Sequence, residues 1–233
     1  MEAWLAWARG PMFWAALTFM ILGLARRLAI TIWEIARAWL RAGDKEVVSR
    51  RLLAATLKWL IPTDRLGNRP LFGLTTLVFH VSVILVPLFL AGHIALWGPA
   101  VGFAWPALPN SLATLLTVAA IVTALALVIE RMASPDARVL SRFQDYALPL
   151  AVAVPFISGF LVMHPRLNPF AYEATLLTHV MSANLVLVLA PITKLSHLVL
   201  LPATQLVSEL AWHFPPDAGS KVGVALGKEG EPI

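Results

Sequence analysis

Histidines are the residues of this chain most able to do chemistry, and four of its six lie in strongly apolar sequence. His80 and His93 are 13 residues apart in one apolar segment, and His179 and His197 are 18 residues apart in another. Ionisable side chains inside a membrane are rare and usually functional. A single intramembrane histidine could merely hydrogen-bond a neighbouring helix. Two histidines on each of two segments instead indicate a binding function.

The spacing of these histidines predicts two pairs that meet across two helices. At about 3.6 residues per turn and 1.5 Å per residue, 18 residues make roughly five turns and about 27 Å. His179 and His197 would then share one helix face near opposite membrane surfaces. A 13-residue step covers about 20 Å and turns by about 220°, but Pro87 between His80 and His93 can kink or rewind that helix. In antiparallel helices, His80 is level with His197, and His93 with His179.

Two imidazole pairs stacked through a membrane suit two bis-histidine haems. Haem is a large apolar cofactor that takes axial histidine ligands between the helices of a bundle. Zinc would require three or four ligands at one point. The chain has no cysteine, which excludes disulfides, cysteine-ligated iron–sulfur clusters and covalent c-type haem. We therefore predict two non-covalent haem b groups.

The composition predicts a membrane protein. Of 233 residues, 59% are apolar and 13% are charged, and the mean hydropathy is +0.77. A soluble domain of this length needs more charge to cover its surface. A hydrocarbon core of about 30 Å takes roughly 20 apolar residues of helix. We predict an all-α, integral membrane five-helix bundle within residues 1–210, with spans at about 11–29, 72–97, 111–129, 143–163 and 174–201.

The distribution of lysine and arginine predicts the orientation of the spans. Basic residues concentrate in the loop 30–70, in the loop after the third span and in the tail 211–233, whereas the segment 98–110 has none. The N-terminus is therefore expected outside and the C-terminus in the cytoplasm of a bacterial or archaeal cell, with the chain in its cytoplasmic (inner) membrane. The stretch LAITIWEIARAWLR within this inner loop has an amphipathic pattern. Such a helix either lies on the lipid surface or docks a cytoplasmic partner.

The segments FHVSVILVPLFLAGH and THVMSANLVLVLAPITKLSH resemble the membrane cytochrome b (gamma) subunit of respiratory nitrate reductase. They also resemble the related membrane subunits of sulfite-reductase-associated, heterodisulfide reductase-like and hydrogenase-linked complexes. The likeness is most specific where P-x-T-K-L-S-H is similar to the family's Pro-Phe-Ser-(Arg/Lys)-Leu-x-His signature. The resemblance implies that His93 and His179 ligate an outer, distal haem, and that His80 and His197 ligate an inner, proximal haem.

The predicted function is electron transfer between the quinone pool and a partner subunit. Because the chain has no cysteine for clusters and no soluble catalytic domain, an iron–sulfur subunit on the cytoplasmic face is expected to complete a respiratory redox complex. His164 and Arg166, before the fifth span, could line a quinone pocket or be ordinary interfacial residues. Lys194 could pair with a haem propionate or extend to the interface. The alternative function is a haem-free anchor or small transporter, in which the histidines relay protons or bind substrate.

Three other polar residues are expected to have structural roles. Asn184 is expected to bond backbone or a neighbouring helix, and Glu130 to form an ion pair with the adjacent Arg131. His213 is expected to be a solvated residue of the tail.

Overall fold

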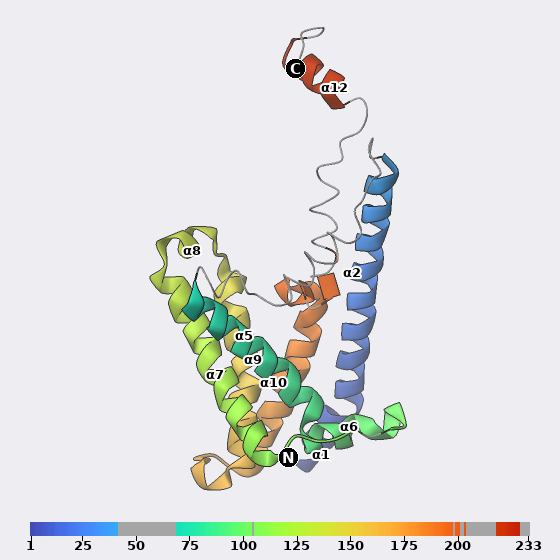
Figure 1. Cartoon of the computed structure of the whole chain (residues 1–233). Coiled ribbons are helices and arrows are strands. Elements are labelled where there is room, and N and C mark those ends of the chain that lie inside the picture. The colour runs from blue at the N-terminus through green and yellow to red at the C-terminus, as the bar shows by residue number, and fades with distance from the viewer. Residues whose placement is uncertain (42–68, 104, 198, 201–202, 204–217, 229–233) are drawn as a thin grey trace. The chain divides into compact units, whose positions relative to one another are not determined.

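The computed structural model describes residues 1–41, 69–103, 105–197, 199–200, 203 and 218–228, and within these ranges it is helical without strands (Figure 1). Five of its helical segments are long and apolar enough to cross a membrane: Glu2–Arg41, Pro70–Phe89, Asn110–Ala133, Phe143–Met163 and Tyr172–Ile192. The prediction of an all-α protein with five such helices is therefore confirmed.

The chain forms two compact units, Met1–Met20 with Pro62–Leu195, and Ile21–Ile61 with Ser196–Ile233. The first unit contains α5 (Pro70–Phe89), α6 (Ala91–Val101), α7 (Asn110–Ala133), α8 (Pro135–Leu140), α9 (Phe143–Met163), the 3₁₀ turn η2 (Pro165–Leu167) and α10 (Tyr172–Ile192). Helix α12 (Ala218–Ala225) belongs to the second unit. Four of the six histidines lie in the first unit, whereas His197 lies in the second.

The first unit is built around α7 and α9, which pack against each other. Helix α5 packs on α7, and α10 packs on α9 (Figure 1). Their shared core contains Val86, Ala120, Val152 and Phe156, one or two from each of α5, α7 and α9. The buried alanines of α7 recur at positions 113, 120 and 124, and such small side chains let helix backbones approach closely.

The N-terminal segment combines three helical pieces. Helix α1 (Glu2–Trp7) leads into the π-helical turn η1 (Ala8–Met12), which contains Pro11, and then into α2 (Phe13–Arg41). Both α1 and η1 pack against α10. There the fully buried Asn184 donates from Nδ2 to the carbonyl oxygen of Ala8 at 3.0 Å, as expected of this residue.

The first predicted span does not end at its arginine pair. Helix α2 runs without a break for 29 residues and includes both that span and the amphipathic stretch that follows it. Arginine is a good helix former, and neither proline nor glycine stands between Leu24 and Arg41, so nothing in the local sequence interrupts the helix. The segment RRLLAATLKWL, residues 50–60, repeats the amphipathic pattern in the sequence and lies outside the described residues.

The second and fifth predicted spans are each interrupted near a proline, where the sequence predicted one helix with a kink. Leu90, with φ −73° and ψ 131°, separates α5 from α6, three residues after Pro87. Helix α10 ends at Ile192, directly after Pro191, and a 3₁₀ turn η3 (Lys194–Ser196) follows. A proline removes one helical hydrogen bond and crowds the preceding turn. His179 and His197 therefore do not share one continuous helix of five turns.

The α7 core suggests a test of the packing. Ala120 is 1% exposed and lies in the cluster with Val86, Val152 and Phe156. We expect Ala120→Leu to destabilise the protein by about 1–3 kcal/mol, because added methylenes force packed helices apart. Thermal unfolding in detergent measures this. Val122→Leu, at a position that is 58% exposed, is the control and should leave the midpoint unchanged. Equal midpoints for both variants would contradict this packing.

Candidate functional site

Two of the four histidines that were predicted to lie in the membrane come together in the first unit. His93 on α6 and His179 on α10 have ring centroids 6.0 Å apart, and their ring planes are within 6° of parallel. Both side chains are half-buried. Helix α6 lies at the same end of the first unit as α1, whereas α8 lies at the opposite end (Figure 1).

Hydrogen bonds define the proton positions of this histidine pair. His93 Nδ1 lies 3.1 Å from the Pro87 carbonyl oxygen, and His179 Nδ1 lies 2.8 Å from the Pro155 carbonyl oxygen. A carbonyl can only accept, so each Nδ1 carries the proton and donates. In a neutral imidazole the other nitrogen, Nε2, then keeps its lone pair. This is the arrangement in which histidine binds a metal, with the second nitrogen oriented by a hydrogen bond.

The end of α5 explains why His93 has its acceptor. The last four carbonyl groups of a helix lack partners inside the helix. Each of these four in α5 finds a donor from the residues that follow: Val86 from the Leu90 amide (3.0 Å), Pro87 from His93 Nδ1 (3.1 Å), Leu88 from Trp105 Nε1 (2.8 Å) and Phe89 from the Leu108 amide (2.8 Å). The His93 imidazole is thus one of four donors that terminate α5.

A glycine makes room for the His179 ring. A Cβ atom on Gly159 of α9 would lie 2.9 Å from Cε1 and 3.0 Å from Nδ1 of His179. Gly159 follows Pro155 by four residues, so it lies one turn after the carbonyl to which His179 donates. The missing side chain therefore leaves that carbonyl open to an imidazole from α10. Gly159 and Pro155 were not predicted as site residues. The sequence feature that could have identified them is a glycine inside a long apolar helix, where glycine is unfavourable.

The separation of the two rings limits how they can interact. A ring nitrogen lies about 1.1 Å from its centroid, so the two Nε2 atoms are at least about 3.8 Å apart, beyond the 2.7–3.2 Å of a direct hydrogen bond. Within the described residues, moreover, no group of three or more His, Asp or Glu side chains could hold a metal ion. Among the described residues, the pair therefore offers two nitrogen ligands on separate helices.

The remaining histidines lie elsewhere. His80 Nδ1 donates to the Thr76 carbonyl oxygen at 2.8 Å, one turn earlier in α5. His197 belongs to the second unit, so the pairing of His80 with His197 stays a prediction. His213 lies outside the described residues.

The predicted quinone residues follow α9. His164 ends that helix and donates from Nδ1 to the Phe160 carbonyl oxygen at 2.8 Å, with its ring 4.3 Å from the Phe160 ring. Arg166 is exposed in η2. His164 follows Gly159 by five residues, so both lie toward the C-terminal end of α9.

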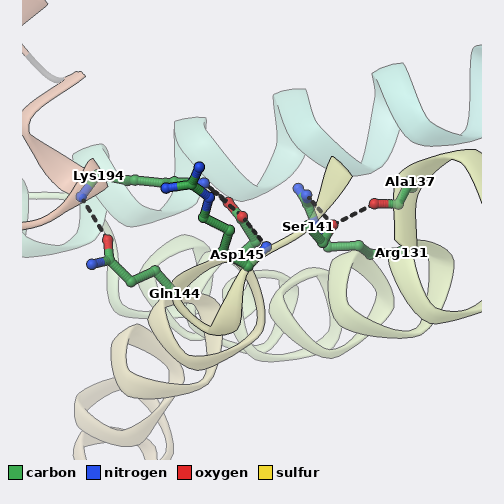
Figure 2. A network of polar contacts seen from close by, with 7 residues as sticks. Arg131, Ala137, Ser141, Gln144, Asp145 and Lys194 are labelled. Atoms are coloured by element: carbon green, nitrogen blue, oxygen red, sulfur yellow. Dashed lines mark hydrogen bonds and ion pairs between the residues drawn. The ribbon is translucent and has the colours of Figure 1, made fainter. Parts of the chain in front are cut away.

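Lys194 forms an ion pair that was not predicted. Its Nζ lies 2.6 and 2.7 Å from the two carboxylate oxygens of Asp145, and its backbone amide donates to Gln144 Oε1 at 3.4 Å (Figure 2). The Asp145 carboxylate also accepts from the Arg142 amide at 2.9 Å and caps α9. The start of α9 is thereby linked to the turn that follows α10.

Glu130 and Arg131 have separate partners instead of the expected ion pair. Glu130 Oε1 accepts from Thr75 Oγ1 at 3.1 Å, which links α7 to α5. Arg131 Nη1 donates to Ser141 Oγ at 3.1 Å, and the Ser141 hydroxyl donates to the Ala137 carbonyl (Figure 2). Each side chain thus bonds a different segment: Glu130 bonds α5, and Arg131 bonds the residue that ends α8.

The fold and the site define a helical protein with five potential membrane spans and a paired-imidazole site. No family model matches the sequence, and no solved structure matches it. A protein of Nitratidesulfovibrio vulgaris (strain Hildenborough) is 36% identical to it over 201 residues, which cover 84% of this chain and 87% of the relative. The chain therefore belongs to the same family as this bacterial protein.

Gly159→Ala tests the contact between α9 and His179. The added methyl group must displace the imidazole from the Pro155 carbonyl, so we expect a loss of about 1–3 kcal/mol in stability. Thermal unfolding in detergent measures the loss, and ¹⁵N-histidine NMR should show a change in the His179 signal. Gly92→Ala is the control, because nothing lies within 4 Å of its added Cβ. A Gly159→Ala variant as stable as Gly92→Ala would contradict the contact.

Proposed function

We propose that the chain is a di-haem b membrane subunit that transfers electrons between the quinone pool and an iron–sulfur partner subunit of a respiratory redox complex. In this proposal it resembles the gamma subunit of nitrate reductase and the related membrane cytochromes b. One observation carries the proposal: the parallel His93 and His179 imidazoles, each held at Nδ1 by a proline carbonyl.

The dimensions of the pair support a bis-histidine iron site. A metal–imidazole bond is about 2 Å long and the nitrogen lies about 1.1 Å from the centroid, so axial imidazoles on one iron have centroids about 6 Å apart. The observed separation is 6.0 Å. Two protein ligands are sufficient for haem iron, because the porphyrin supplies the other four. Gly159 supports the fit, since it leaves space on α9 where the distal imidazole must be oriented.

The residues of this chain have distinct tasks in the proposed electron transfer. His93 and His179 would hold the distal haem, and His80 and His197 the proximal haem. When bound, the haems supply one-electron redox chemistry between the two membrane faces. The Pro87 and Pro155 carbonyls accept hydrogen bonds from the Nδ1–H groups. These bonds fix the orientation of each ring and raise the basicity of the ligating nitrogen.

Charge supports the proposed orientation in the bacterial cytoplasmic membrane. The basic residues of the segment 30–70 and of the tail favour the cytoplasmic side, where an iron–sulfur partner would dock. The segment 98–110, which lacks lysine and arginine, would then face outward together with the end of α9. A quinone exchanging from the membrane would find His164 and Arg166 at that outer end.

Haem content is the direct test of this function. Purified protein should show a dithionite-reducible b-type spectrum with about two haems per chain, extractable with acid acetone because no cysteine can tether them. Pyridine haemochrome analysis gives the stoichiometry. A colourless, fully folded preparation would exclude the proposal and favour the anchor or transporter.

Ligand variants test the assignment of the haems. His93→Ala and His179→Ala should each remove the same haem, and His80→Ala and His197→Ala should each remove the other. Redox titration of the remaining haem identifies which one is lost. His164→Ala serves as a matched histidine control that keeps both haems. Loss of the same haem in His93→Ala and in His197→Ala would contradict the assignment.

The position of the quinone site is tested with variants that retain both haems. His164→Ala and Arg166→Ala should slow oxidation of a quinol analogue at least several-fold and weaken the inhibitor-induced shift of the distal haem spectrum. The physical reason is the loss of a proton acceptor and of a cation near the distal pair. The control is Arg138→Ala on α8, at the opposite end of the first unit. Wild-type rates in both variants would exclude this site.

A further inference from the structure

Trp97 has a buried hydrogen-bond donor without an acceptor. Its indole Nε1 is buried, and none of the residues that the structure describes accepts its proton. The ring itself is packed, with its centroid 5.9 Å from that of Phe13 at the start of α2. A buried tryptophan N–H usually has a partner, and each exception in a native structure needs an explanation.

The position of Trp97 relates this donor to the histidine pair. Trp97 follows His93 by four residues in α6, so the two side chains lie on one face of that helix. Four residues correspond to about 6 Å along the helix axis. Trp97 is therefore one turn farther than His93 from the break at Leu90, toward the C-terminal end of α6.

We propose that the Trp97 indole donates a hydrogen bond to a propionate carboxylate of the distal haem. This proposal rests on the proposed function, because it requires a haem on His93. A carboxylate held in a membrane needs donors, and a bond between an N–H group and an ionised oxygen is about twice as strong as a neutral one. Trp97 supplies such a donor one turn from His93, and the carboxylate supplies the acceptor that none of the described residues provides.

A second tryptophan beside Phe13 makes the proposal testable. The Trp14 ring centroid lies 5.2 Å from that of Phe13, and Trp14 is 39% exposed. Trp14→Phe therefore removes an indole that belongs neither to the histidine pair nor to the end of α5. Trp97→Phe removes a buried donor that has no acceptor among the described residues, while keeping an aromatic ring against Phe13.

The experiment compares Trp97→Phe and Trp14→Phe in haem-loaded protein. Trp97→Phe should lower the midpoint potential of the distal haem, because a carboxylate with one donor fewer stabilises the ferric state. It should also shift the propionate bending band in the resonance Raman spectrum. Trp14→Phe should change neither quantity, and the proximal haem should titrate as in the wild type in both variants.

Three outcomes would decide against the proposal. An unchanged distal potential and propionate band in Trp97→Phe would overturn it, as would equal shifts in both variants. Weaker binding of a quinol analogue with an unchanged haem would assign the donor to quinone instead. Wild-type protein without haem would refute the proposed function itself, which separates that failure from failure of the Trp97 assignment.

Discussion

The structure of the site depends on the need of every backbone carbonyl in an apolar environment to find a donor. Lipid offers no hydrogen bonds, so carbonyls released at a helix end must be satisfied by protein groups. Helix α5 ends inside its apolar segment and releases four of them, and the donors are two amides, one indole and the His93 imidazole. The orientation of His93 is therefore a consequence of how α5 terminates. The same requirement explains why the break after α5 and the His93 imidazole occur together.

The other half of the histidine pair differs, because His179 donates to a carbonyl in the middle of a helix that already has another donor, the Ser158 hydroxyl at 3.3 Å. A carbonyl oxygen has two lone pairs, so the Pro155 carbonyl can accept from His179 in addition to its helical partner. Access is normally blocked by the side chain one turn later, and here that residue is Gly159. The pair thus depends on the end of α5, which orients His93, and on Gly159, which lets His179 reach the Pro155 carbonyl. Away from His179, the start of α9 and the turn that follows α10 are joined by the ion pair between Asp145 and Lys194.

Sequence reasoning predicted the features that depend on composition and missed those that depend on contacts between distant residues. Length and hydropathy are local properties, and the helix Phe143–Met163 has the bounds of the fourth predicted span. The break at Leu90 was anticipated only as a kink at Pro87, because the strength of a proline's effect depends on the neighbouring helices. The partner of Lys194 is 49 residues away, and nothing in the local pattern identifies Asp145. The role of Gly159, which is to leave room for the His179 ring, becomes visible only once α10 is packed on α9.

The tautomer of the pair also constrains the proton relay that the sequence left open as an alternative. Because the protons of His93 and His179 are both committed to carbonyls, neither neutral imidazole can donate to the other through Nε2. Their separation of 6.0 Å would in any case keep those nitrogens beyond direct hydrogen-bond distance. A proton passed directly between the rings, as a relay would require, therefore needs the pair to rearrange. The pair instead presents one unprotonated ring nitrogen from each of two helices, which is the form of imidazole that binds a metal.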